Sequence, residues 1–229
     1  MNRLLFVVNN YEEFDCADLL AKHLGGWKID FATEVPSNPS DFQLIILWSY
    51  RKIIKHIPEP NNVIIFHSSD LPQGRGWAPL YYAIAEEKEF LVISGILAAP
   101  EVDSGDIVIK ARFRILPNYT ASILRRFDNE VSIMAIRKIL DRFKDRPLIG
   151  RPQKGQATYR KRRAKNDNLF NVDRPFRELV SHFRACEPDT PALFEYKEQM
   201  YSVTVTPASA PEFTQNIEFI FAEDEIVTS

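Results

Sequence analysis

The apolar residues in the first part of the chain follow two kinds of pattern. Short continuous runs are typical of strands in a parallel sheet, because both faces of such a sheet are covered. These runs predict strands at Leu4–Asn9, Trp27–Ala32, Phe42–Trp48, Val63–His67 and Phe90–Leu97. Helical spacing predicts helices at Glu12–Leu24, ended by Gly25-Gly26, and from Pro79 to about Lys88. Strands alternating with helices predict an α/β fold with a Rossmann-like, doubly wound and mostly parallel sheet.

Two further elements follow the last of these strands. A tight turn at Val102–Asp106 leads into Ile107–Arg114, whose polar positions predict an exposed or edge strand. A long helix fits Thr120–Lys144, but the apolar residues of its two halves lie on different sides. We therefore expect this helix either to break near its middle or to be buried over a broad face.

The composition of the sequence and its pattern of apolar residues change at Pro147. A polar, basic and turn-rich stretch is followed by an amphipathic helix at about Arg174–Ala185, a strand-like stretch at Ala192–Val205 and a final apolar run at Ile217–Phe221. This change predicts a first domain over residues 1–147. Residues 148–229 are predicted to form a small α+β extension that makes substrate contacts, dimer contacts or both.

Composition narrows the class of protein. The 229 residues carry a formal net charge of −2, and no segment reaches the 18 apolar residues expected of a membrane span. The apolar run Leu4–Val8 is too short for the core of a signal peptide, which favours a first strand. Cys16 and Cys186 lie far apart and are interpreted as thiols of a reducing cytoplasm. No cluster has the spacing of metal ligands, so neither a metal nor a membrane partner is expected.

One basic run, Arg160 to Lys165, stands out from this balanced charge. It is either a solvated loop or a binding site for a small anion. A single short basic run on a slightly acidic protein offers too little positive charge to bind nucleic acid, so no nucleic-acid partner is expected.

Polar residues follow several predicted strands. Ser49 and Tyr50 come after the third strand, His67 ends the fourth, and Asp103 lies in the turn before Ile107. Ligands of open parallel sheets bind at the carboxyl ends of strands, so these side chains are expected to meet along one rim. Taken singly, each residue favours a simpler interpretation: His67 as a capped or partly buried histidine, and Asp103 as a turn former that bonds its own backbone.

Two motifs carry a resemblance to a known family. The run from His67 to Gly76, "HSSDLPQGRG", resembles the His-x-Ser-x-Leu-Pro signature of the folate-dependent formyltransferases. "EVDSGDIVIK" resembles the segment of that family that carries its catalytic aspartate, here Asp103. Farther on, the stretch from Pro152 to Arg163 resembles the segment that follows the catalytic domain in nucleotide-sugar N-formyltransferases.

The resemblance implies transfer of a formyl group from 10-formyltetrahydrofolate to an amine, without a metal. His67 and Asp103 are then the catalytic residues, donating to the forming oxyanion and moving the amine proton. The resemblance places Ser49, Tyr50, Leu71, Pro72, Gly76 and Asp106 at the folate. It places Ser68, Arg75, Gln153, Tyr159, Arg162 and Arg163 at the acceptor.

The sequence departs from the family at Ile65, where the family usually carries an asparagine that donates to the oxyanion. Loss of such a donor typically costs about 2.7–4 kcal/mol in transition-state stabilisation. Another donor, such as Ser68, Ser69, a backbone amide or a water, then compensates; otherwise turnover is slow or lost.

The leading hypothesis is a cytoplasmic nucleotide-sugar N-formyltransferase for a bacterial surface polysaccharide, such as the O-antigen of lipopolysaccharide. It would bind folate and a nucleotide-linked amino-deoxy sugar, and pairing of its C-terminal strands would make a homodimer. One alternative is a formyltransferase acting on initiator tRNA or a ribonucleotide amine. Another is a binding protein for folate or a nucleotide sugar that has lost catalysis.

Overall fold

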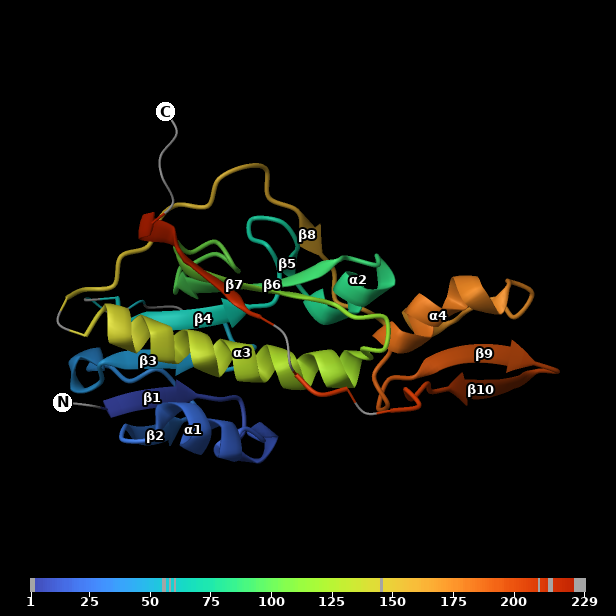
Figure 1. Ribbon diagram of the computed structural model, residues 1–229, viewed down its shortest axis with the longest axis horizontal. Helices are drawn as coiled ribbons and strands as arrows, with labels where there is room; N and C mark the ends of the chain where they lie inside the picture. Colours follow the sequence, from blue (N-terminus) through green and yellow to red (C-terminus); the bar gives the residue numbers. More distant parts are fainter. Residues whose placement is uncertain are drawn as a thin grey trace.

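A computed structural model describes residues 3–54, 57, 59, 61–144, 146–209, 211–213 and 216–224. Its centre is a seven-stranded sheet with the order β11-β7-β6-β4-β3-β1-β2 (Figure 1). The strands are β1 (Arg3–Val7), β2 (Lys28–Ala32), β3 (Leu44–Leu47), β4 (Val63–His67), β6 (Phe90–Leu97), β7 (Ile107–Arg114) and β11 (Glu218–Phe221). Strands β1 to β4 are parallel, β6 is antiparallel to β4, and β7 returns to the common direction before the antiparallel β11. The predicted α/β fold with a mostly parallel sheet is confirmed.

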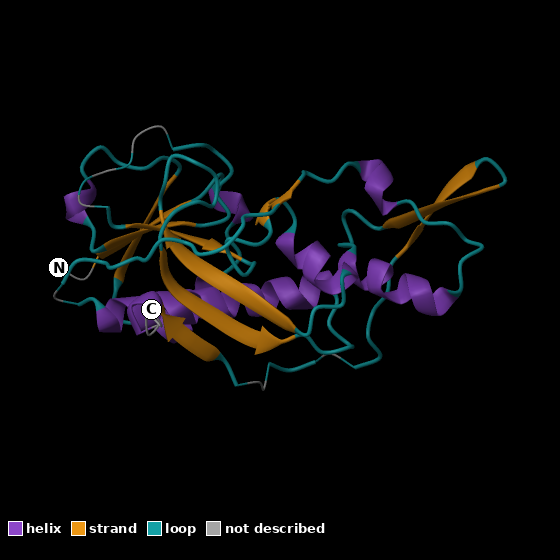
Figure 2. Cartoon of the chain, turned by 90° about the horizontal axis from the view of Figure 1, so that it is seen from above, coloured by secondary structure: helices purple, strands orange, loops and turns teal. Residues whose placement is uncertain are grey.

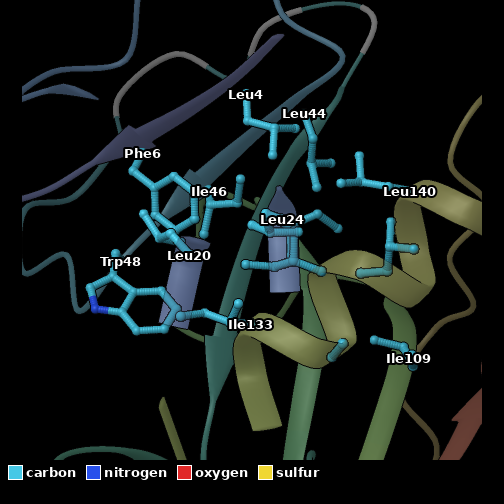
Figure 3. Close-up of a cluster of buried hydrophobic side chains, with 14 of the residues drawn as sticks. Leu4, Phe6, Leu20, Leu24, Leu44, Ile46, Trp48, Ile109, Ile133 and Leu140 are labelled. Carbon is cyan, nitrogen blue, oxygen red and sulfur yellow. The ribbon is translucent and has the colours of Figure 1, made fainter. Parts of the chain in front are cut away.

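Helices α1 (Ala17–Leu24) and α3 (Ala121–Arg142) cover one face of the sheet. Figure 3 shows their contacts with the strands, where side chains that alternate along β1 and β3 meet the two helices. The buried set includes Leu4, Phe6, Leu20, Leu24, Leu44, Ile46, Ile133 and Leu140. On the opposite face, Leu5, Val7, Ile45 and Leu47 form a second cluster against Tyr50 and Ile54. Burial on both faces explains why these strands are continuous apolar runs.

The long helix α3 is continuous, and of the two alternatives the broad buried face is correct. Leu124 and Phe127 in its first half pack on a cluster with α2 (Pro79–Ala85), β6 and β7. Ile136 and Ile139 in its second half pack on the cluster with β1 and β3. The two halves of the helix pack against different clusters. The apolar side of α3 therefore changes direction along its length.

Sequence expectations differ from the structure most clearly at β7 and α1. The predicted edge strand is an interior strand, because β11 pairs with β7 in antiparallel register from Glu218–Arg112 to Phe221–Ile109. Its alternating basic residues belong to a sheet face and do not mark an edge. Helix α1 begins at Ala17 instead of Glu12, because Asn10 caps a separate 3₁₀ turn, Tyr11–Glu13, by accepting from the Glu12 amide.

The later part of the chain forms α4 (Phe176–Ala185) and a hairpin of β9 (Ala192–Tyr196) and β10 (Gln199–Val203). This hairpin extends from the end of the molecule where α4 lies (Figure 2). A short pairing of β5 (Arg75–Gly76) with β8 (Tyr159–Arg160) ties the basic stretch to the loop after β4. The division of the chain at residue 147 stays a prediction.

Both cysteines are free and buried. Among the described helices, none is long and apolar enough to cross a membrane.

The turn after β11 is held by hydrogen-bonded ion pairs to Glu223 from Arg142, the last residue of α3, and from Arg146, which follows the helix. These hydrogen bonds hold the pKa of the Glu223 carboxyl well below its ordinary value of 4.5, at about 2. A depressed carboxyl pKa stabilises the fold above the ordinary value, and this stabilisation is lost as the pH falls through the folded-state value.

We therefore expect Glu223→Gln to lower the free energy of unfolding at pH 7 by about 1 kcal/mol, since the pairs are only partly shielded from solvent. The difference from the unsubstituted protein should shrink between pH 4.5 and about 2. Urea denaturation across that range measures it. Glu218→Gln, which removes the exposed ion pair with Arg112 on the same segment, is the control and should cost less. Equal losses for both variants at every pH would contradict the expectation.

Candidate active site

A cleft of about 1110 Å³ opens at the carboxyl ends of β3 and β4. Its walls include Ser49 and Tyr50 after β3, His67 at the end of β4, and Asp103 from the turn between β6 and β7. The sequence predicted that these residues would meet along one rim, and the structure brings them together. They lie where ligands bind in open parallel sheets.

His67 and Asp103 lie against each other in the wall of the cleft, with 3.5 Å between Nδ1 and Oδ2. The other ring nitrogen, Nε2, is 2.9 Å from the carbonyl oxygen of Gly74. A carbonyl only accepts, so this contact assigns a hydrogen to Nε2. In the neutral ring, the lone pair of Nδ1 then faces the carboxylate. The pair is therefore arranged to hold one additional proton between Nδ1 and Oδ2.

Asp103 is fixed from two sides. Its Oδ2 accepts a hydrogen bond of 2.8 Å from the Gly76 amide, whereas an ordinary turn-forming aspartate bonds its own backbone. Its backbone has a φ of 51°, and its carbonyl accepts from Gln153 Nε2, which also donates to Gly105. The carboxylate is thus held toward His67 by a loop and by a side chain that are distant in sequence.

The loop that follows His67 is rigid because the segment around Thr158 holds it. The Gly74 amide donates to Thr158 Oγ1 over 2.8 Å, and Ser69 Oγ donates to the carbonyl of Gln73. Gly76 has a φ of 95°, and a Cβ there would lie 2.6 Å from the carbonyl oxygen of Arg160. Only glycine allows both this conformation and this close approach.

The residues predicted at the two substrates divide into two groups. Those that line the cleft are Ser49, Tyr50, Gly76, Ser68, Arg162 and Arg163. Those that do not line it are Leu71, Pro72, Asp106, Arg75, Gln153 and Tyr159. In the second group, Arg75 Nη2 donates to Gln153 Oε1 over 2.7 Å and its Nη1 to the Tyr159 hydroxyl over 2.9 Å. These three residues form a network behind the loop, where they support Asp103 and Gly76.

One end of the cleft is formed by the segment after β3. Its lining combines apolar Ile53, Ile54 and Val102 with the charges of Arg51 and Lys52. Burial raises the pKa of the Tyr50 hydroxyl, which donates to the carbonyl of Thr33. This end suits a flat, largely apolar group that carries an anionic tail.

The other end lies between α2, α3 and the basic stretch. Its charged lining residues are Arg125, Asp128, Arg162, Arg163, Lys165, Glu187 and Asp189. Arg125 pairs with Glu187 over 2.7 Å, and the guanidinium of Arg163 lies 3.2 Å above the Tyr81 ring. Arg162 lies 4.8 Å above the Trp77 ring and has no carboxylate partner within the described ranges. This end is polar and offers cations to an anionic ligand.

Sequence reasoning missed Trp77, Arg125 and Asp128, all of which line the cleft. The available signal was the spacing of Ala121, Arg125 and Asp128, which share one side of α3 at i, i+4 and i+7. Burial raises the pKa of Asp128 to about 6. Ser68 and the charges of Arg125 and His67 lower this pKa, but their effect is smaller than that of burial.

Ile65, two residues before His67 on β4, also lines the cleft. Its apolar side chain occupies the position where the family resemblance leads one to expect an asparagine. Asn62 does not replace it, because its amide donates to the carbonyls of Pro39 and Phe42 outside the cleft. Of the sequence-proposed substitute donors, Ser68 lines the cleft and Ser69 does not.

No group of three or more potential metal ligands is present among the described residues.

Comparison with known proteins gives a consistent picture, although no protein-family model matches the chain. A methionyl-tRNA formyltransferase of Acetivibrio thermocellus is 29% identical over 168 residues, which cover 71% of this chain and 54% of the relative. That of Buchnera aphidicola is 31% identical over 149 residues, 63% of this chain and 48% of the relative. The chain therefore spans about half the length of the curated relatives it matches.

Solved structures share the fold over most of the chain. A methionyl-tRNA formyltransferase from Clostridium thermocellum matches with a TM-score of 0.71 at 17% identity, covering 96% of this chain and all of that chain. A 4-N formyltransferase from Francisella tularensis matches with a TM-score of 0.70 at 15% identity, covering 91% and 98%. HypX from Aquifex aeolicus, in complex with tetrahydrofolic acid, matches with a TM-score of 0.71 at 18% identity, covering 89% of this chain and 37% of that chain. The chain has the formyltransferase fold, and the resemblance first drawn from its motifs is confirmed.

The geometry of the loop leads to a prediction about Gly76. Gly76→Ala should lower the free energy of unfolding by about 3 kcal/mol, because it adds the strain of a positive φ to a clash with the Arg160 carbonyl. Chemical denaturation measures the loss, and hydrogen exchange of the Gly76 amide should show that its bond to Asp103 has weakened.

Gly155→Ala is the matched control, since Gly155 has a φ of 100° with nothing near its absent side chain. It should cost only the strain of the backbone, about 1 kcal/mol. Equal losses in the two variants would show that the contact with Arg160 does not hold the loop.

Proposed function

We propose that this protein is an N-formyltransferase that transfers a formyl group from 10-formyltetrahydrofolate to the amine of a nucleotide-linked amino-deoxy sugar. The observation that carries the proposal is the His67–Asp103 pair, which lies where two chemically different ends of one cleft meet. Transfer between two substrates requires such a junction, because the reacting atoms must be brought within about 3.5 Å of each other. The sequence similarity to formyltransferases supports the same reaction.

The end of the cleft near β3 fits the folate donor, which supplies the formyl group. Its apolar residues, Ile53, Ile54 and Val102, suit the flat pterin and benzoyl rings. Arg51 and Lys52 complement the glutamate carboxylates of the donor. Ile53 and Val102 are exposed, as are Arg51 and Lys52, whereas Ile54 is half-buried. The donor would therefore lie along an open apolar surface, with its formyl group toward His67.

The His67–Asp103 pair handles the proton of the incoming amine. As the amine attacks, its nitrogen becomes more acidic, and the arrangement of Nδ1 and Oδ2 can take up the proton that it sheds. The charge of Asp103 stabilises the ring once it is protonated. The Gly74 carbonyl keeps Nε2 in place throughout, so the ring does not have to reorient during the reaction.

The opposite end fits an acceptor that carries phosphate. Arg162 and Lys165 offer positive charge, and Trp77 offers an aromatic surface for a nucleobase. With the phosphates there, an amino sugar would extend toward His67. A formamido sugar made in this way would serve a bacterial surface polysaccharide, and pairing of the hairpins in a homodimer remains part of this proposal.

A second candidate acceptor is initiator tRNA, because the curated sequence relatives named above are methionyl-tRNA formyltransferases. The acids at the acceptor end, Glu187 and Asp189, favour the smaller acceptor, since a polyanion is better served by a surface of unbroken positive charge.

The proposal is tested by incubating the purified protein with 10-formyltetrahydrofolate and a panel of acceptors. The panel should contain nucleotide-linked amino sugars, a ribonucleotide amine and charged initiator tRNA, with formylated products detected by mass spectrometry. We expect a nucleotide-linked formamido sugar with the unsubstituted protein, and a rate at least about a hundredfold lower with His67→Ala. Formylation of tRNA alone would move the assignment to the second candidate. Binding of folate without any transfer would identify a binding protein.

The apolar residue at position 65 leads to a separate prediction. Ile65→Asn places a hydrogen-bond donor in the cleft two residues before His67, and we expect kcat to rise by about tenfold or more. Ile65→Leu is the control, since it changes the shape of the side chain without adding a donor. Circular dichroism would confirm that both variants fold. An unchanged kcat in folded Ile65→Asn would mean that another group already stabilises the oxyanion.

A further inference from the structure

Asp128 is an acid in the wall of the cleft for which the reaction described above has no role. It projects from α3 on the side shared by Ala121 and Arg125, and all three residues line the cleft. Ser68, which follows directly after His67, is close enough to lower the pKa of the Asp128 carboxyl, although burial raises it more strongly. The oxygen Oδ1 is shielded from bulk solvent and has no hydrogen-bond partner among the described residues.

The charged and titratable groups around Asp128 come from three elements. His67 and Ser68 face it from the end of β4, and Arg125 lies one turn away on α3. The Cys16 thiol approaches from the segment before α1, and its pKa is raised mainly by burial, then by Asp15, with a smaller contribution from the charge of Asp128. Burial raises the pKa of Asp128 itself to about 6, so the group exchanges a proton near neutral pH.

An ionised carboxylate with an unpartnered oxygen costs free energy in the folded state. Among the residues that the structure describes, no hydrogen bond recovers this cost at Oδ1. Buried polar groups that oppose stability are characteristic of positions kept for a ligand or a reaction. The location beside His67, at the acceptor end of the cleft, indicates that the ligand group is the acceptor amine.

The proton balance of formyl transfer leaves room for a second acceptor of protons. An alkylamine with a pKa of about 10 is an ammonium ion at neutral pH, with three protons and no lone pair for attack. The amide product keeps one of these protons. Two must therefore leave the nitrogen: one ends on N10 of the released tetrahydrofolate, and the other passes to solvent.

We propose that Asp128 is a second catalytic residue, which binds the acceptor ammonium group and removes its first proton. The N–H bond breaks with its electron pair left on nitrogen, and an O–H bond forms on the Asp128 carboxylate. The neutral amine then attacks the formyl carbon. The His67–Asp103 pair takes the second proton and delivers it to the departing N10, while Asp128 releases the first proton to solvent. This role rests on the proposed formyltransferase function.

The experiment compares the unsubstituted protein with Asp128→Asn, which keeps the shape of the side chain but cannot accept the proton. The acceptor is the amine that the unsubstituted protein formylates fastest in the panel above. We expect Asp128→Asn to lower kcat/KM for that amine about a hundredfold and to leave the dissociation constant of tetrahydrofolate unchanged. Asp128→Glu should recover part of the activity. Asp141→Asn, which removes an exposed carboxylate from the same helix, should have no effect.

Two measurements separate this role from a structural one. Carbon-13 NMR of the ligand-free protein should show a carboxyl group that titrates near pH 6 and is missing in Asp128→Asn. Because the folded-state pKa is raised, the ionised carboxylate destabilises the fold increasingly from about pH 4 to pH 6. Asp128→Asn should therefore be more stable than the unsubstituted protein at pH 8, whereas loss of a structural contact would make it less stable.

The outcomes distinguish this inference from the function on which it rests. If the unsubstituted protein formylates no acceptor, the proposed function fails, and the role of Asp128 fails with it. If the protein is active and Asp128→Asn has the same kcat/KM and pH profile, only the role of Asp128 is overturned.

Discussion

The candidate site depends on one carboxylate that is held between a ring and an amide. Asp103 Oδ2 lies 3.5 Å from His67 Nδ1. The same oxygen accepts a hydrogen bond of 2.8 Å from the Gly76 amide. The same loop that supplies this amide also supplies the Gly74 carbonyl to the opposite side of the ring. One short segment therefore fixes both members of the pair. The supporting groups that hold this segment, Thr158 and Gln153, come from the second half of the chain.

This arrangement gives the second half of the chain a part in the site without contact with the reacting atoms. Arg75, Gln153 and Tyr159 were expected at the acceptor, but they form a network behind the loop. Arg162 and Arg163, a few residues later, do reach the cleft. A single stretch thus supports the loop with its first residues and lines the polar end of the cleft with its next ones. Its basic character reflects the second task, since the first depends mainly on amide and hydroxyl groups.

Much of the sheet was predictable because strands buried on both faces are continuous apolar runs in the sequence. Strands β4, β6 and β7 begin and end at the residues expected from their apolar runs and flanking turns. The pairing of β11 with β7 was not predictable, because nothing local in either strand specifies a partner so distant in sequence. The start of α1 was missed because Asn10 caps an earlier turn through its side chain. In the site, strand ends and motifs pointed to His67 and Asp103. Asp128 was missed because only tertiary packing brings the side of α3 that carries it to the cleft.

The position of β11 bears on how the molecule is assembled on the ribosome. Phe219 pairs with Ala111, so β7 keeps one row of amides and carbonyls unpaired while the intervening chain is made. An open strand of this kind can recruit other chains through backbone hydrogen bonds. Alternating Lys110, Arg112 and Arg114 along β7 would repel a second copy of the same strand during that interval. The basic residues that suggested an edge strand would thus disfavour aggregation through β7 until β11 joins the sheet.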